Sequence, residues 1–276
     1  MSDDPWQIGR LDLDGYLQRL GVPARDPSRK ALDELHEAHV RAFTFDNIDV
    51  LLEQHPGVST AALDEKFVGR GRGGYCFEHA SVFAAAAERL GYRVTRRLGR
   101  VGVPSEAGRT HMVVWVDIDG DRLLCDLGFG LTLVRPIPLG DGAEDDYLGW
   151  TYRVRRVATD GAAAWELHRF RDEGWELMHT HDELTVYPAD VTMGHHFTST
   201  FPDSHFRHRL MVTRLLPERH VTVTDSAVTV RRGGRPTEHR PLGDGELADM
   251  LAELGVPLTD DEQRRLLAKV ATLPAA

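Results

Sequence analysis

The chain has 276 residues, of which 41% are hydrophobic and 28% charged, as in ordinary globular proteins that bury a substantial core. Its formal net charge of -10 argues against a nucleic-acid or anionic-membrane partner, because like charges repel and no strongly basic tract offsets them. Two cysteines are too few for a disulfide framework, and no run of about 18 apolar residues predicts a membrane span. The opening MSDDPWQIGR lacks the pattern of a secretory signal, so we expect a cytoplasmic protein with reduced thiols.

Residues 1–90 are expected to be mostly helical. The first predicted helix has apolar side chains on one face and ends at a glycine; these residues are Leu13, Tyr16, Leu17, Leu20 and then Gly21. Further helices are predicted over residues 31–43, 62–70 and 77–92, and the last of these is rich in alanine.

The pattern changes after Tyr92. Short alternating runs separated by Gly, Asp and Pro continue to about residue 190, and they predict a β-rich module, either a sandwich or a barrel. The last third combines a hairpin over residues 220–232 with a closing helix. Thr259 and Glu262 form the T-x-x-E pattern of a capping box at the start of that helix.

Cys76 follows a glycine pair and precedes the alanine-rich helix. Gly73 and Gly74 permit a tight turn and a close approach of other groups to the backbone. A thiol at a helix N-terminus is favoured as thiolate, and Arg70 and Arg72 would add positive potential. Cys76 is therefore a candidate nucleophile, and the alternative is a buried cysteine with a packing role.

A predicted hairpin supplies a base and an orienting group for that nucleophile. Asp119-Gly120 is a strong two-residue turn signal, and a loop there pairs residue 118 with 121 and 113 with 126. His111 and Asp126 then lie on one face of the sheet as diagonal neighbours within reach of each other. The alternative is an ion pair at the hairpin end without a catalytic role.

The other face of this hairpin is apolar. It would carry Met112, Val114, Val116, Leu123 and Cys125, so the second cysteine is expected to pack in the core.

Several other histidines, and the glutamate that follows Cys76, are not expected to take part in catalysis or metal binding. His79 would share a helix face with Cys76 but has poor geometry for a base, so packing or capping is expected. Glu78 lies in the first helical turn, where a carboxylate suits the helix dipole. The pairs His179/His181 and His195/His196 have no third cluster at ligand spacing, so no metal site is predicted.

Three motifs resemble those of the arylamine N-acetyltransferases. Arg72-Gly73-Gly74-Tyr75-Cys76-Phe77-Glu78-His79 is similar to the nucleophile motif of that family. Thr110-His111-Met112 and Asp126-Leu127-Gly128-Phe129-Gly130 resemble the motifs that carry its histidine and aspartate. The resemblance runs in order over residues 10–215, which makes it more specific than any single motif.

The resemblance implies an α+β fold in three parts with a cysteine-peptidase-like catalytic core. These parts would be an N-terminal helical bundle over residues 1–90 carrying Cys76, a central β-barrel over 91–195 carrying His111 and Asp126, and a C-terminal α/β lid over 196–276.

The resemblance also implies the reaction. Cys76 would attack acetyl-CoA, the acyl donor and cosubstrate, and an arylamine or hydrazine would then take the acyl group from the Cys76 thioester. His111 would transfer the protons and Asp126 would orient the imidazole, with no metal involved.

Substrate-binding residues follow from the same motifs. Phe45, Tyr75 and Phe129 would wall the acceptor pocket. Gly128, Gly130 and Phe206 would lie near the acyl-donor cleft. For each of these the alternative is ordinary packing.

Three departures from the family pattern leave the substrate open. Ala80 stands where the family usually has Asn, Thr44-Phe45-Asp46-Asn47 stands where it has Pro-Phe-Glu-Asn, and His195-His196 stand where it has an aromatic pair. One alternative is an amide synthase that closes a macrolactam from a polyketide held by an acyl carrier protein. The others are a transglutaminase-like or thiol-hydrolase enzyme, and a binding relative without activity.

Overall fold

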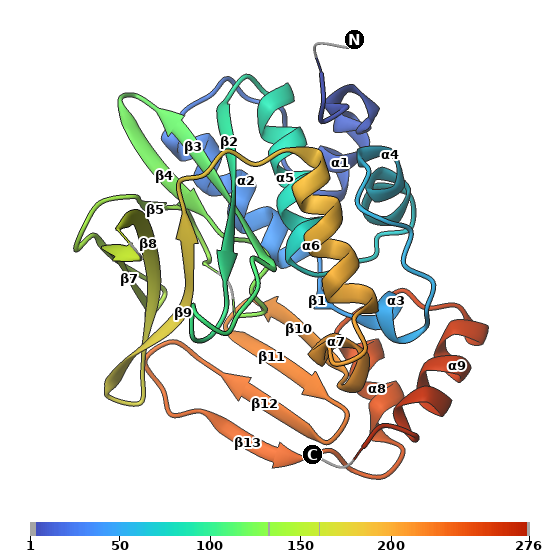
Figure 1. Cartoon of the computed structure of the whole chain (residues 1–276). Helices are drawn as coiled ribbons and strands as arrows, with labels where there is room; N and C mark the ends of the chain where they lie inside the picture. Colours follow the sequence, from blue (N-terminus) through green and yellow to red (C-terminus); the bar gives the residue numbers. More distant parts are fainter. Residues whose placement is uncertain (1–3, 132, 160, 275–276) are drawn as a thin grey trace.

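Helices make up most of the N-terminal part of the computed structural model, which describes residues 4–131, 133–159 and 161–274 (Figure 1). They are η1 (Ile8–Arg10), α1 (Leu13–Leu20), α2 (Arg29–Ala42), α3 (Ile48–Leu51), α4 (Thr60–Leu63), the π-helical η2 (Asp64–Gly69) and α5 (Cys76–Arg89). The predicted helices are confirmed. Gly21 ends α1 in the left-handed conformation, with φ of 70°, and α5 begins at Cys76 itself.

The central part is one eight-stranded antiparallel sheet in the order β5-β4-β3-β2-β9-β8-β7-β6. The strands are β2 (Arg93–Arg100), β3 (His111–Ile118), β4 (Asp121–Cys125), β5 (Ile137–Pro138), β6 (Glu144–Tyr147), β7 (Trp150–Thr159), β8 (Ala162–Arg171) and β9 (Gly174–Asp182). The edge strands β5 and β6 also contact each other, which brings the sheet close to a closed barrel. The predicted β-rich module is therefore a barrel.

A second sheet has the order β1-β10-β11-β12-β13. Its strands are β1 (Phe45–Asp46), β10 (Met211–Leu216), β11 (Arg219–Thr224), β12 (Ala227–Arg231) and β13 (Glu238–Pro241), and it is accompanied by α6 (Pro188–Thr200), α7 (His205–His208), α8 (Glu246–Glu253) and α9 (Asp260–Val270). The hairpin and the capped closing helix predicted from the sequence are both present. The α+β fold class is confirmed. The proposed boundary at residue 195 falls within α6 and stays a prediction.

Helix α5 lies against the barrel through β2 and β3, and its residues 76–87 are all buried (Figure 1). One face of the β3–β4 hairpin packs in the same core as α5, and this face includes Cys125 as predicted. Val113, Trp115 and Leu124, on the other face, belong to a second core inside the barrel. The hairpin is therefore buried on both sides, so polar groups on it need partners within the protein.

No helix in the described ranges combines the length and the apolar character that crossing a bilayer requires.

Candidate active site

The turn that precedes Cys76 accepts only glycine at two positions. A Cβ at Gly73 would lie 1.8 Å from the carbonyl oxygen of Thr44, and one at Gly74 would lie 2.2 Å from a carboxylate oxygen of Glu78. The close approach predicted from the glycine pair is therefore confirmed. It places the start of α5, and with it Cys76, directly against the chain that enters β1.

Glu78 closes the N-terminus of α5. One of its oxygens accepts a hydrogen bond from the backbone N–H of Tyr75 at 3.0 Å, while the other lies 2.6 Å from the ammonium of Lys66. Burial disfavours the charged carboxylate, but Lys66 and His55 outweigh burial and hold the pKa of Glu78 well below its usual range. The charge predicted at this helix end is therefore present and is balanced by a buried cation.

Arg70 and Arg72 do not give Cys76 the free positive potential expected from the sequence. Arg72 is fully buried and binds Asp49 at 2.8 Å and Glu262 at 3.2 Å. Arg70 binds the same oxygen of Glu262 at 2.5 Å. The two guanidinium groups therefore serve as ion-pair partners of carboxylates, and that prediction is corrected.

The β3–β4 hairpin has the predicted register. Ile118 pairs with Asp121 across the turn, and Val114 pairs with Cys125. That parity brings His111, the first residue of β3, to the same face as Asp126, which follows the last residue of β4. Nε2 of His111 lies 3.2 Å from a carboxylate oxygen of Asp126, and both side chains are buried.

The thiol of Cys76 lies beside the imidazole of His111, which also binds Asp126. Its Sγ is a donor to the carbonyl oxygen of Thr110, at 3.4 Å, and Thr110 is the neighbour of His111. Burial disfavours an imidazolium, but the charge of Asp126 and hydrogen bonds with Asp126 and Cys76 outweigh burial and raise the pKa of His111 to about 10. The same contacts hold the pKa of Asp126 well below its usual range despite burial. An imidazolium beside a thiol favours the thiolate.

A second imidazole, that of His179, binds Asp126, and no local sequence pattern predicts this contact. Nε2 of His179, on β9, lies 3.1 Å from the other carboxylate oxygen of Asp126. Burial lowers the pKa of His179, so the ring is neutral and its Nε2–H donates to the carboxylate. His179 entered the sequence analysis only as half of a histidine pair, because a contact between strands 53 residues apart leaves no local pattern.

The same three side chains also have the spacing of possible metal ligands. Among the described residues, ligand atoms of His111, Asp126 and His179 lie within 4.8 Å of one another, the spacing that a metal ion needs. The hydrogen bonds between them already account for this proximity. His181, the other half of the pair, accepts a hydrogen bond from the indole of Trp115 at 3.1 Å. The expectation of no metal stays a prediction.

A chain of hydrogen bonds runs from Tyr16 to the turn before Cys76. Nε2 of His79 lies 3.0 Å from the Thr44 carbonyl and 3.1 Å from the Gly74 carbonyl, so this nitrogen carries the proton. Its Nδ1 accepts from Nε2 of His39 at 2.8 Å, and His39 in turn accepts from the Tyr16 hydroxyl at 2.7 Å. Burial lowers the pKa of His39, and lowers that of His79 to about 4. His79 therefore has the packing role expected, not that of a base.

The predicted substrate-binding residues lie close to one another or to the Cys76–His111–Asp126 group. A Cβ at Gly128 would lie 2.5 Å from the Cα of Cys76, so only glycine lets this loop reach the nucleophile. The ring centroids of Tyr75 and Phe206 are 5.5 Å apart, and those of Phe206 and Phe45 are 6.3 Å apart.

Phe129 and Gly130 lie close to the aromatic wall formed by Tyr75, Phe206 and Phe45. The ring of Phe129 meets the ring of His111 edge-on, with centroids 5.3 Å apart. Gly130 has a φ of 86° and lies against the ring of Phe45. The structure thus brings together all six residues singled out in the sequence, and their roles toward a substrate stay predictions.

His195, one of the departures from the family pattern, also reaches this wall. Its Nδ1 is hydrogen-bonded to the hydroxyl of Tyr75, and its ring lies 4.2 Å from that of His55. Helix α6 is thereby joined to the residue that precedes the nucleophile.

A buried Cys-His-Asp constellation at the junction of a helix and a barrel is typical of acyl-transfer and hydrolytic enzymes with a thiol nucleophile. A family profile described as N-acetyltransferase matches residues 29–262. The chain is 32% identical over 272 residues to the arylamine N-acetyltransferase / N-hydroxyarylamine O-acetyltransferase of Salmonella typhimurium, covering 96% of this chain and 95% of that one. It is 33% identical to the arylamine N-acetyltransferase of Mycolicibacterium smegmatis, with 95% and 98% of the two chains covered.

Solved structures agree with these sequences. The arylamine N-acetyltransferase of Mycobacterium abscessus superposes with a TM-score of 0.91 at 30% identity, over 98% of this chain and 99% of the other. The Mycobacterium marinum enzyme in complex with CoA gives 0.88 at 31% identity, over 96% and 100%. The chain belongs to the arylamine N-acetyltransferase family and is an acyltransferase.

Proposed function

We propose that this enzyme moves an acetyl group from acetyl-CoA to the nitrogen of an arylamine or hydrazine through a thioester on Cys76. The observation that carries the proposal is the ion pair of His111 and Asp126 beside the Cys76 thiol at the start of α5. A positively charged imidazolium next to a thiol is the arrangement that activates a cysteine nucleophile.

The first half-reaction loads the enzyme. The Cys76 thiolate attacks the carbonyl carbon of the donor thioester, and the bond from that carbon to the CoA sulfur breaks. His111 gives its proton to the departing sulfur, so that CoA leaves as a thiol and the imidazole becomes neutral. Asp126 holds the ring in place throughout, because both of its oxygens are fixed by imidazoles.

The second half-reaction restores the starting state. The amine nitrogen attacks the thioester carbon, and neutral His111 accepts the proton that the nitrogen loses. The bond to Sγ breaks and regenerates the thiolate beside an imidazolium, so protons and charges balance over the cycle. The aromatic wall, together with the ring of Phe129, suits a flat acceptor ring. The printed names of the relatives, and the CoA complex of one of them, support both the acceptor and the donor.

Mass spectrometry of the intact protein tests this mechanism. Incubation with acetyl-CoA and no amine should add one acetyl group, and an arylamine should remove it. Cys76→Ala should abolish the adduct. Cys125→Ala is the matched control and should keep it, because the Cys125 side chain packs in the core on the opposite face of the hairpin from His111 and Asp126, and burial raises the pKa of its thiol.

Two results would contradict the proposal. One is a folded Cys76→Ala variant that still transfers acetyl groups. The other is an unaltered protein that gains no acetyl group from acetyl-CoA yet accepts an acyl chain from a carrier protein, which would favour an amide synthase.

A further inference from the structure

Two helices far apart in the sequence, α5 and α9, share one capping contact: the third residue of each helix, Glu78 or Glu262, accepts a hydrogen bond from the N–H of the cap residue, Tyr75 or Thr259. In both helices one carboxylate oxygen accepts this hydrogen bond at 3.0 Å. In both helices the other oxygen is turned toward buried cations. Each glutamate therefore belongs both to a helix cap and to an ion pair.

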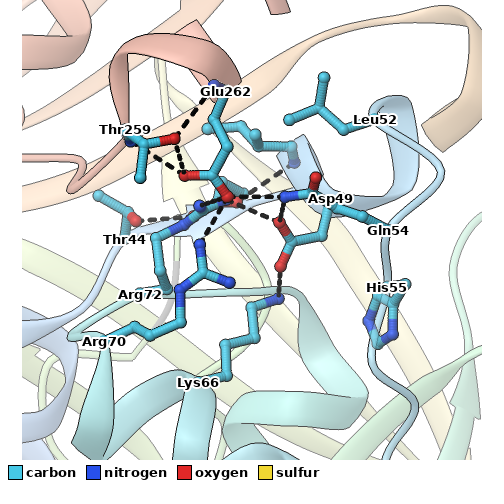
Figure 2. Close-up of polar contacts among 12 residues, drawn as sticks. Thr44, Asp49, Leu52, Gln54, His55, Lys66, Arg70, Arg72, Thr259 and Glu262 are labelled. Carbon is cyan, nitrogen blue, oxygen red and sulfur yellow. Dashed lines mark hydrogen bonds and ion pairs between the residues drawn. The ribbon is translucent and has the colours of Figure 1, made fainter. Parts of the chain in front are cut away.

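These ion pairs form one continuous chain, shown in Figure 2 for all of its members except Glu78. Glu262 binds Arg72 at 3.2 Å, and Arg72 binds Asp49 at 2.8 Å. The other oxygen of Asp49 binds Lys66 at 2.8 Å, and Lys66 binds Glu78 at 2.6 Å. We name these five residues the ion chain: Glu262, Arg72, Asp49, Lys66 and Glu78. Negative and positive charges alternate along it from α9 to α5.

Two members of the ion chain, Arg72 and Glu78, belong to the segment that carries Cys76, which we call the nucleophile segment (residues 72–78). Arg72 and Glu78 stand on either side of Cys76 in the sequence, four residues before it and two after it. Arg72 is fully buried, and among the described residues the carboxylates of Asp49 and Glu262 are its ion-pair partners. If Glu262 is lost, the guanidinium of Arg72 keeps only its ion pair with Asp49, and Asp49 also pairs with Lys66.

Glu262 is the part of the ion chain contributed by the C-terminal third of the protein. It also accepts from Arg70 at 2.5 Å and from Gln54 at 2.8 Å, so its oxygen is held by three donors from the N-terminal part (Figure 2). These contacts, the cap and Arg72 hold the pKa of Glu262 at about 2 despite partial burial. No part of Glu262 reaches the triad.

We propose that Glu262 is a positioning residue for Cys76, acting through Arg72, so that the ion pair between α9 and the nucleophile segment sets the reactivity of Cys76. This inference deepens the proposed function and rests on it for the acetylation readout alone. Alkylation of Cys76 by iodoacetamide reports on the thiol without any acyl chemistry, so a failure of the proposed mechanism is distinguishable from a failure of this inference.

The experiment compares two neutralised carboxylates in the first turn of α9. Glu262→Gln removes a charge from the ion chain, whereas Asp261→Asn removes one that contacts only exposed Arg264 and Arg265. Glu262→Gln should slow both acetylation in a single turnover and alkylation of Cys76 by about three- to tenfold, as weakening of one charged contact implies. Asp261→Asn should leave both rates unchanged.

Thr259→Ala separates positioning from stability. It removes the hydroxyl of the α9 cap and lowers the melting temperature, but it keeps the pair of Glu262 with Arg72, so both rates should stay at the level of the unaltered protein. If Glu262→Gln lowers the melting temperature and leaves both rates unchanged, α9 has a purely structural role and the inference is wrong.

A second variant decides the matter if Glu262→Gln does not fold. Glu262→Asp keeps the charge, and Asp190 in the capping box of α6 shows that aspartate can close such a box. Its shorter side chain withdraws the carboxylate from Arg72, so both rates should fall. Unaltered rates in Glu262→Asp would also overturn the proposal.

Discussion

Two groups of buried charges adjoin the segment that carries Cys76, and they are built from different side chains. The triad group joins Asp126 to two imidazoles, His111 and His179. The ion chain joins its carboxylates to an ammonium and a guanidinium, Lys66 and Arg72. In both groups burial opposes charge, and specific partners outweigh it.

The difference lies in what each group does during a reaction. An imidazole can give up a proton and take it back, as the proposed mechanism requires of His111, so the triad group is able to change its charge. Lysine and arginine keep their protons, so the charges of the ion chain are permanent. Groups of the first kind suit catalysis, and groups of the second kind suit a fixed framework around it. The predictions below test that division.

The largest effect is expected from the triad carboxylate. Asp126→Asn keeps the shape of the side chain but removes the charge that stabilises the imidazolium of His111. Steady-state acyl transfer should fall by about 10⁴-fold, the loss known when the aspartate of a catalytic triad is replaced in this way. Asp121→Asn, at the exposed start of the same strand, is the control and should retain full activity. Retention of more than a tenth of the activity in folded Asp126→Asn would contradict the assignment.

A change in the ion chain should act first on stability. Lys66→Met keeps the length of a buried side chain but leaves Asp49 and Glu78 without their shared cation. The free energy of unfolding should fall by about 3–5 kcal/mol, the usual cost of breaking a buried ion pair on one side. Urea denaturation measures this, with Lys30→Met on the exposed face of α2 as control. An unfolding free energy equal to that of the unaltered protein would show that the ion chain does not stabilise the fold.

The two groups should also differ in alkaline solution. The pKa of His111 is raised to about 10 from an ordinary 6.5, so its stabilising contribution is complete below pH 6.5 and is lost as the pH rises through about 10. The depressed pKa values of Glu78 and Glu262 act at the other end of the scale. Their contribution is present above the ordinary value of 4.5 and is lost as the pH falls toward their lowered pKa values, which for Glu262 is about 2.

Urea denaturation at a series of pH values tests this. The loss of stability between pH 6.5 and 10 should shrink in His111→Phe and persist in Lys66→Met. An alkaline slope that is the same in His111→Phe and in the unaltered protein would assign it to other groups.

Local patterns were enough to predict the catalytic hairpin. The parity of a two-residue turn at Asp119-Gly120 placed His111 and Asp126 on one face, because alternation along a strand is a property of the backbone itself. The packing role of Cys125 followed from the same alternation. The start of α5 at Cys76 followed from the glycine pair, because a residue with a side chain would clash with the neighbouring carbonyl of Thr44.

The rest depended on contacts between distant parts of the chain. His179 meets Asp126 only because β9 closes against the barrel, and nothing near residue 179 signals that contact. Arg72 and Glu262 are 190 residues apart, so the sequence showed a basic residue near a thiol but not the carboxylates that neutralise it. The expectation that Arg70 and Arg72 add positive potential at Cys76 is therefore wrong. The sequence predicts the capping box of α9 but not the ion pair that its Glu262 forms with Arg72.

The hydrogen-bond chain from Tyr16 through His39 to His79 has a direction. Every proton in it is assigned: each donor points away from Tyr16 and toward the carbonyls beside the nucleophile turn. The carbonyl oxygens of Thr44 and Gly74 at its end have no proton to donate, so the chain cannot run in the reverse direction. Burial keeps His39 and His79 neutral, and they hold the turn before Cys76 in place. The proton transfers proposed at Cys76 are therefore left to His111.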